Sequence, residues 1–305
     1  MNTQAVQLGE VQETLLIPLY GRAVASRSPK SVLHDTKAQE IVDQLDYDFS
    51  LMEGQPSLQG AVLRTLTYDH LLKELLGSYS EATVVELGCG LNTRFERLND
   101  HRLRWFDLDM PDVYALWQKF FKENERRTFL PYSAFDESWV VQVKETNSTP
   151  PYIFISEAST IYFSEEQNRQ LFALLAKHFP GCYYIFDTAT DYFIRRQNKH
   201  DTLKFFSARI QWEVNDIQEV AAWDEQYHQL RSVNFFTNPP EHLKQQISLS
   251  YRMLGKILGI FNAPFVRQYQ LNVFQLAGTP VAGTPVGSIH QGADHLEHGS
   301  EQVQG

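Results

Sequence analysis

The chain has 305 residues, a formal charge of −10 and an apolar fraction of 43%, so it can bury a sizeable core. The acidic balance leaves no basic patch to neutralise phosphates, and we therefore expect no nucleic-acid partner. No basic leader and no apolar run long enough to cross a bilayer is apparent. We therefore expect a cytoplasmic protein that is not attached to a membrane. The oligomeric state cannot be predicted from these features.

The first 60 residues are predicted to form an N-terminal helical extension. Helices are expected over residues 15–25 and 37–45, and the extension carries enough apolar side chains to pack against the rest of the protein. A further helix over residues 63–76 has apolar residues at helical spacing and stops at Gly77.

Strand and helix patterns then alternate along the chain, which predicts an α/β fold with a mostly parallel central sheet. The clearest helices cover residues 113–123 and 164–178, and residues 61–276 form the expected main domain. Residues 190–250 mix aromatic and charged positions, and we expect a lid insertion there that also contributes to the sheet. The expected strands are residues 83–87, 103–108, 128–131, 152–156, 182–187 and 269–276.

Residues 277–305 differ in kind from the rest of the chain. The segment Ala-Gly-Thr-Pro-Val occurs twice in tandem and a polar stretch follows, which cannot bury enough apolar surface to offset its ordering entropy. The three histidines of this tail, His290, His295 and His298, are expected to be solvated, and we predict no metal site. Truncation after about Val281 should leave turnover unchanged.

The most informative motif follows the first expected strand of the main domain. This apolar strand runs into Gly88 and Gly90, and the next strand ends in an acid, Asp109, some twenty residues after the first glycine, as in sites for nucleotide-like ligands. The dinucleotide-binding motif has a third glycine at the position of Thr93, and no phosphate-loop lysine is present. The motif therefore favours a small adenosine-containing ligand without a pyrophosphate, namely S-adenosylmethionine, and argues against a nicotinamide oxidoreductase.

A second acid, Glu157, follows the expected strand over 152–156. A carboxylate at Asp109 can accept both hydroxyl hydrogens of a ribose, and Asp107 is the alternative if Asp109 does not. Either acid alone would be read as a helix cap or a surface residue. At the carboxyl ends of successive strands, however, Asp109 and Glu157 indicate a site. The two cysteines, Cys89 and Cys182, are expected to be buried thiols.

The residues from 12 to 276 resemble the leucine carboxyl methyltransferase family, and within it the bacterial O-methyltransferases of the tetracenomycin polyketide type. This resemblance implies a Rossmann-like, S-adenosylmethionine-dependent methyltransferase fold. The matching motifs are Gly60-Ala-Val-Leu-Arg-Thr65, Glu86-Leu-Gly-Cys-Gly-Leu-Asn-Thr-Arg94, Phe106-Asp-Leu-Asp-Met-Pro111 and Ile155-Ser-Glu-Ala-Ser-Thr-Ile-Tyr162.

The resemblance also implies site residues, because family members place an arginine, a glycine, an aspartate and a glutamate against the cofactor. Arg64 would bind the methionyl carboxylate through its planar fork, and Glu157 would bind the methionyl ammonium. Adenine contacts are implied for the region of Ser133 and Ala134, where the motif matches only loosely. The full set of implied cofactor-binding residues is Arg64, Glu86, Gly88, Gly90, Asp109, Ser133, Ala134 and Glu157.

The chemistry expected is direct displacement at the sulfonium methyl group, helped by alignment and desolvation. A carboxylate acceptor needs no general base, whereas a phenol or alcohol does. No histidine lies in a motif that marks it as a base. Tyr162 and His70 are weak catalytic candidates, and His70, like His228 in the expected lid, is more easily read as structural. This favours a carboxylate or an acidic phenol.

The expected substrate is a small, polyketide-like molecule. Aromatic and cationic residues that can line its pocket are Tyr20, Arg22, Tyr162 and Trp223. For any single one of them, core and lid packing is the favoured alternative. The N-terminal extension is expected to close the acceptor pocket. The alternatives are a protein C-terminal carboxyl methyltransferase and a non-catalytic S-adenosylmethionine-binding protein; the joint presence of Arg64 and Glu157 favours an enzyme.

Overall fold

The computed structural model describes most of the chain. The described residues are 4–29, 31–146, 148–234 and 268–278, with the single positions Pro240, Glu241, Leu243 and Met253. The repeat from Thr279 on and the histidines of the predicted tail lie outside the described residues, as does most of the segment between β8 and β9.

A seven-stranded sheet with the strand order β5-β4-β3-β6-β7-β9-β8 organises these residues. The strands from β5 to β7 pair in parallel, and β9 runs antiparallel to both of its neighbours. Each predicted strand is confirmed to within two residues at either end. The strands are β3 (Ala82–Leu87), β4 (Leu103–Asp109), β5 (Arg127–Pro131), β6 (Tyr152–Ser156), β7 (Cys182–Ala189), β8 (Tyr227–Val233) and β9 (Tyr269–Leu276).

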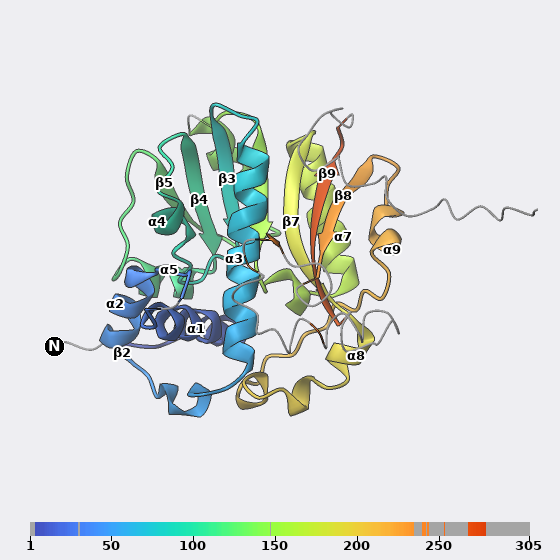
Figure 1. The fold of residues 1–305 in the computed structure, drawn as a ribbon. Coiled ribbons are helices and arrows are strands. Elements are labelled where there is room, and N and C mark those ends of the chain that lie inside the picture. Colours follow the sequence, from blue (N-terminus) through green and yellow to red (C-terminus); the bar gives the residue numbers. More distant parts are fainter. Residues whose placement is uncertain are drawn as a thin grey trace, which may run out of the picture.

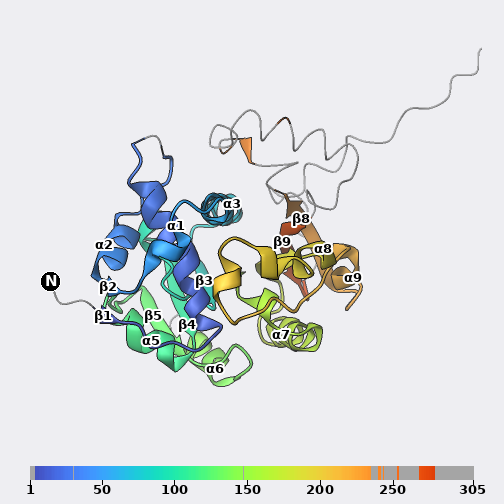
Figure 2. The same ribbon diagram turned by 90° about the horizontal axis from the view of Figure 1, so that it is seen from below.

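Helices cover both faces of the sheet, and alternate strand residues pack against each layer (Figures 1 and 2). On one face, Val85 of β3 belongs to a core cluster that also includes residues of α6 (Ser138–Glu145), α7 (Glu165–His178) and α9 (Ile217–Ala221). On the other face, Val84 packs with α3 (Ser57–Leu76) and α4 (Arg94–Leu98). The arrangement is that of a Rossmann-like α/β fold, as the sequence predicts.

The N-terminal segment lies across the carboxyl ends of the strands. Figure 1 shows α1 (Leu16–Ser26) and α2 (Thr36–Gln44) beyond the arrowheads of β3 and β4. Both helices share a core with α5 (Pro111–Trp117) and with residues Cys89 and Leu91 of the loop after β3. A short parallel pair of strands, β1 (Gln4–Ala5) and β2 (Leu45–Asp46), joins the two ends of the segment.

The expected lid over residues 190–250 divides into two parts where it is described. Residues after β7, including α8 (Asp191–Ile194), lie near the carboxyl ends of the strands and line a cavity there. Residues 217–233 instead form α9 and the edge strand β8. His228 lies on β8 and not in a lid, because β8 pairs with β9.

Candidate active site

A cavity of about 880 Å³ opens where the parallel strands end, which is the usual place for a ligand in an α/β sheet. The loop after β3 lines the cavity with Gly88 and Gly90, β4 contributes Asp109 from its last position, and the residue after β6 contributes Glu157. Helix α3 adds Arg64 from the side. The structure therefore brings together residues that are spread over almost a hundred positions in the sequence.

The two glycines of the loop have left-handed backbones, with φ angles of +66° at Gly88 and +53° at Gly90. Residues with a Cβ atom rarely adopt this conformation. A Cβ atom at Gly88 would overlap the Ser159 side chain, lying 2.6 Å from its Cβ atom, and one at Gly90 would lie 3.0 Å from the Leu15 Cβ atom. The sequence predicts a collision with the cofactor at these positions. The structure shows that a side chain would first collide with the protein itself.

Asp109 is held with its carboxylate at the cavity wall. Its Oδ2 atom accepts a hydrogen bond from the Gly90 amide and its Oδ1 atom from the Met110 amide, both at 2.8 Å. Each oxygen keeps a further lone pair, so the carboxylate can accept two ribose hydroxyls. Burial raises the pKa of Asp109 to about 6, although both amides oppose this.

Asp107, the alternative ribose ligand, does not face the cavity. It is 1% exposed, and its carboxylate accepts hydrogen bonds from the Trp105 indole at 3.0 Å and from the Arg127 guanidinium at 2.5 Å. Among the two acids at the end of β4, only Asp109 is placed to meet a cofactor.

Arg64 and Glu157 form an ion pair beside the glycine loop. The Nε atom of Arg64 donates to Glu157 Oε1 at 3.0 Å, and the Thr65 hydroxyl donates to the same oxygen at 2.8 Å. Within the described chain, this leaves the two terminal nitrogens of Arg64 available for a carboxylate. Burial disfavours ionisation of Glu157, but Arg64 and Arg94 outweigh burial and hold the pKa of this carboxyl below its usual range.

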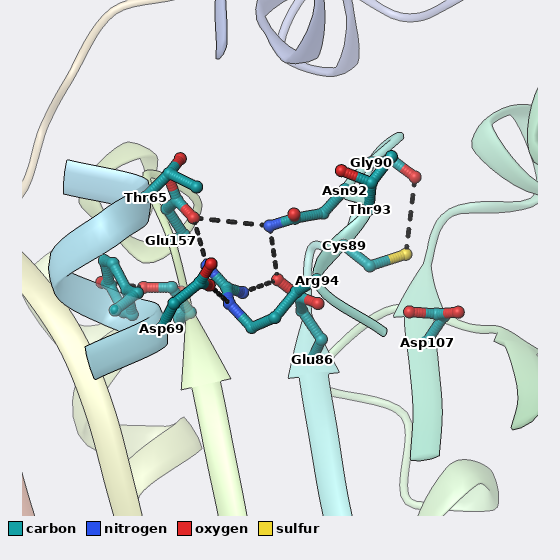
Figure 3. A network of polar contacts seen from close by, with 12 residues as sticks. Thr65, Asp69, Glu86, Cys89, Gly90, Asn92, Thr93, Arg94, Asp107 and Glu157 are labelled. Carbon is teal, nitrogen blue, oxygen red and sulfur yellow. Dashed lines mark hydrogen bonds and ion pairs between the residues drawn. The ribbon is translucent and has the colours of Figure 1, made fainter. Parts of the chain in front are cut away.

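Glu157 also belongs to a buried network of charges that sequence reasoning missed (Figure 3). At its centre lies Arg94, whose side chain is fully buried and donates to Asp69 at 2.8 Å, to Glu157 at 2.5 Å and to Glu86. Four arginines balance four acids in this network: Arg22, Arg64, Arg94 and Arg97 with Asp35, Asp69, Glu86 and Glu157. Pairing of this kind offsets the cost of burying charge.

Glu86 does not line the cavity, although the sequence predicts it as a cofactor-binding residue. It is 2% exposed, lies below the cavity wall within β3, and accepts hydrogen bonds from Arg94 and, at 2.7 Å, from the Asn92 side chain. Burial raises the pKa of Glu86 to about 7, against the lowering effect of Arg94. Glu86 can act on a cofactor only through its partners: Asn92, which itself lines the cavity, and Arg94, which bonds to Glu157.

Ser133 and Ala134 line the cavity at the other end of the sheet, after β5, together with Tyr132 and Phe135. These residues give this end of the cavity aromatic and apolar walls with backbone polar groups, which suits an adenine ring. The structure thus places all but one of the predicted cofactor residues on the cavity, Glu86 being the exception.

The predicted substrate and catalytic residues are more scattered. Tyr162 is buried and lines the cavity. Tyr20 stacks on Phe49 at 4.8 Å and Trp223 packs on Phe172 at 5.2 Å. His70 pairs with Glu74 along α3 at 3.2 Å. None of these last three is among the described residues that line the cavity.

Arg22 lines the cavity but is committed to the protein interior. It is 2% exposed; its Nε atom donates to Asp35 at 3.1 Å and its Nη2 atom to the Leu91 carbonyl at 2.9 Å. Two of its guanidinium nitrogens are thus held by the protein, and the binding of an anionic substrate by Arg22 stays a prediction. The two bonds connect α1 to the glycine loop.

Tyr269 and Asp187 form a second polar pair at the cavity, which sequence reasoning also missed. Tyr269, the first residue of β9, lines the cavity, and its hydroxyl donates to Asp187 Oδ2 at 2.5 Å. The Ala158 amide donates to the same oxygen at 2.8 Å, whereas Oδ1 is buried without a hydrogen-bond partner in the described chain. Burial raises the pKa of Asp187 to about 6, partly opposed by Arg64 and Tyr269.

Across the described ranges, no group of three or more histidine, cysteine, aspartate or glutamate side chains is arranged to hold a metal ion. No described helix is both long and apolar enough to span a bilayer. Cys89 and Cys182 are both buried and free, as the sequence predicts.

Solved structures share this fold. The chain matches a protein described as a putative methyltransferase from Thermobifida fusca with a TM-score of 0.54 and 11% identity, over 86% of this chain and 94% of that one. It matches a DUF574 family protein from Streptomyces avermitilis with a TM-score of 0.52 and 12% identity, over 86% and 97% of the two chains. At such low identity, the likeness is one of fold.

Sequence comparison adds the family. The chain is 26% identical to a tetracenomycin polyketide synthesis O-methyltransferase, TcmP, of Streptomyces glaucescens, over 70% of this chain and 78% of that protein. It is 28% identical to an S-adenosyl-L-methionine-dependent methyltransferase, dpfgK, of Gibberella zeae, over 57% and 63% of the two proteins. The family model described as leucine carboxyl methyltransferase matches residues 16–176, more than half of the chain.

These matches confirm the predicted fold, family and cofactor. The protein is an enzyme of the methyltransferase class whose cofactor is S-adenosylmethionine. The carboxylates of Asp109 and Glu157, at the carboxyl ends of β4 and β6, are chemically suited to the hydroxyl and ammonium groups of that molecule. The chain belongs to the leucine carboxyl methyltransferase family.

Proposed function

We propose that this enzyme is an O-methyltransferase that acts on a small, polyketide-like acceptor carrying a carboxylate, a phenol or an alcohol. The observation that supports it best is the arrangement of Arg64, Gly88, Asp109 and Glu157 around one cavity that extends well beyond them. The similarity to the Streptomyces glaucescens enzyme supports the same acceptor class.

Each cofactor-facing residue has a role that follows from its geometry. Asp109 would accept the ribose hydroxyls, and the free terminal nitrogens of Arg64 would bind the methionyl carboxylate. Glu157 would attract the methionyl ammonium while remaining ionised, because Arg64 and Arg94 hold its charge. When bound, S-adenosylmethionine supplies an electrophilic methyl group to the acceptor.

The acceptor half of the cavity lies on the side of β7 and β9. Ser133 follows β5, Asp109 is the last residue of β4, and Glu157 follows β6, so the cofactor would occupy that part of the sheet edge. Beyond Glu157, the cavity is lined by Tyr162, Phe193 and Tyr269, among others. Such walls exclude water from the reacting oxygen, which promotes displacement by a desolvated nucleophile.

The possible acceptors differ in whether the enzyme has to remove a proton from them. A carboxylate is already ionised at neutral pH and needs no base. A hydroxyl has to lose its proton as the new oxygen–methyl bond forms, and the Tyr269–Asp187 pair offers a path for it: the Tyr269 oxygen would receive the acceptor's proton while the tyrosine's own proton passes to Asp187. The side chains at the cavity thus accommodate both kinds of acceptor.

The proposal is tested with methyl-labelled S-adenosylmethionine and three groups of acceptors: aromatic polyketide acids, aromatic polyketide phenols, and a peptide with a C-terminal leucine. Mass analysis identifies the product, and mild alkali then separates methyl esters, which it cleaves, from methyl ethers, which it does not. We expect label in a small molecule. Label only in the peptide would establish the protein carboxyl methyltransferase instead. Cofactor binding without any transfer would favour the non-catalytic alternative.

A further inference from the structure

Four parts of the chain meet at Asp35, which is 2% exposed. As the N-cap of α2, Asp35 accepts a hydrogen bond from the Ala38 amide at its Oδ1 atom, at 2.9 Å. Its Oδ2 atom accepts from Arg22 of α1 at 3.1 Å, from the Thr93 hydroxyl, and from Arg97 of α4 at 3.4 Å. One carboxylate thereby joins α1, α2, α4 and the loop that follows β3.

The loop after β3 is bound to this group at three consecutive positions. The Leu91 carbonyl accepts from Arg22 at 2.9 Å, the Asn92 side chain accepts from Arg97 at 3.2 Å, and the Thr93 hydroxyl bonds to Asp35. The same loop presents Gly88 and Gly90 to the cavity. Its conformation therefore depends on contacts made by the N-terminal segment.

The contacts continue from the loop to the groups that face the cofactor. Asp69 accepts from Arg97 at 2.9 Å and from Arg94 at 2.8 Å, and Arg94 donates to Glu157 at 2.5 Å. On the other side of the loop, the Gly90 amide holds Asp109 at 2.8 Å. Because the network is buried and its charges balance, loss of one carboxylate leaves arginines unpaired in a low-dielectric region.

We propose that Asp35 is a positioning residue of the cofactor site, through which the N-terminal segment of residues 4–46 sets the affinity for S-adenosylmethionine. The segment thus acts on the cofactor, and not only on an acceptor as the sequence predicts. Binding and ordering are coupled in both directions, so the cofactor also stabilises the contact between α1 and the loop.

The test uses the full chain, with S-adenosylhomocysteine as the probe. Asp35→Asn removes the charge but keeps a residue that caps helices well, so α2 retains its first turn. The control is Asp43→Asn, also on the N-terminal segment, whose carboxylate pairs with Arg27 on the surface with 62% exposure. Calorimetry gives the dissociation constant, circular dichroism gives the folded fraction, and hydrogen exchange reports protection of residues 88–93.

We expect Asp35→Asn to weaken binding roughly tenfold in fully folded protein, within the usual range for coupled sites. The bound state should also lose protection of residues 88–93, whereas Asp43→Asn should behave as the parent. A merely structural role would lower the melting temperature of Asp35→Asn and leave the dissociation constant of the folded protein unchanged, and that result would overturn the proposal.

A milder variant decides the question should Asp35→Asn not fold. Thr93→Val removes the hydroxyl that donates to Asp35 and accepts from Arg97, which itself bonds to Asp35, and keeps the side-chain volume. We expect weaker binding of S-adenosylhomocysteine in the same direction, and an unchanged dissociation constant would refute the coupling. The identity of the methyl acceptor does not enter either measurement, so failure of the O-methyltransferase proposal would leave this test intact.

Discussion

Gly88→Ala should destabilise the fold more than an ordinary glycine substitution, because two separate costs meet at this position. The left-handed backbone at φ +66° costs a residue with a Cβ atom about 1–2 kcal/mol. The new Cβ atom would also overlap the Ser159 side chain, and overpacking of this kind costs about 1–3 kcal/mol. We therefore expect a loss of about 2–5 kcal/mol in the free energy of unfolding.

Gly54→Ala separates the two costs. Gly54 has a similar backbone, at φ +71°, but a Cβ atom there would have nothing within 4 Å. Its loss should therefore be the backbone cost alone. In the double variant Gly88→Ala/Ser159→Gly, the overlap is relieved, and a double-mutant cycle should return about 1–3 kcal/mol of coupling between the two sites.

Urea unfolding of the parent and of the variants Gly88→Ala, Gly54→Ala, Ser159→Gly and Gly88→Ala/Ser159→Gly, followed by circular dichroism, measures these differences. If Gly88→Ala were no less stable than Gly54→Ala, the close approach of Ser159 would not be a real constraint. If Ser159→Gly failed to recover stability in the Gly88→Ala background, the cost would have to lie elsewhere in the loop.

Three further predictions concern the cavity and its network. Because the pKa of Asp109 is about 6, its carboxylate takes up a proton as the pH falls through that value, and affinity for S-adenosylhomocysteine should fall with it. In Asp109→Asn, calorimetry should show an affinity that does not change with pH over this range. An equally steep pH dependence in that variant would assign the titration to another group. Tyr269→Phe should lower kcat for hydroxyl acceptors by about 10²–10⁴-fold and leave kcat for carboxylate acceptors almost unchanged. Equal losses of kcat in rate assays on both kinds of acceptor would show that Tyr269 moves no proton. Arg94→Met should lower the free energy of unfolding by about 3–5 kcal/mol, because it leaves buried acids unpaired. The control Arg169→Met removes a surface pair with Glu165 and should cost less than about 1 kcal/mol. Similar urea unfolding curves for the two variants would contradict the importance of the network.

The strands and the principal helices could be predicted because their side chains are buried on both faces or along one stripe. All six residues of β3 are buried, for example, so its apolar run is unambiguous. Residues 190–250 were expected to contribute to the sheet, but the bounds of the edge strand β8 were not predicted, because only its two end residues are buried and its sequence is half polar. Helix α3 begins six residues before the predicted start at Leu63, since Gly60 lies within its first turns.

Within the site, acids that follow apolar strands were predictable, because parallel strands end at the same edge. The charge network was not. Arg94 and Asp69 are ordinary surface types in sequence, and they are buried only because α3 packs over the end of β3. The same tertiary contacts place Arg22 on Asp35 and Tyr269 on Asp187. No local pattern marks any of these pairs.

The most direct test of the proposed cofactor site is a crystal structure of the full chain with S-adenosylhomocysteine. The ribose hydroxyls should lie within hydrogen-bond distance of the Asp109 carboxylate, the amino-acid carboxylate at the terminal nitrogens of Arg64, and the ammonium beside Glu157. A ligand bound with its adenosine end at Glu157, or bound outside the cavity lined by Gly88 and Asp109, would contradict the assignment of the site.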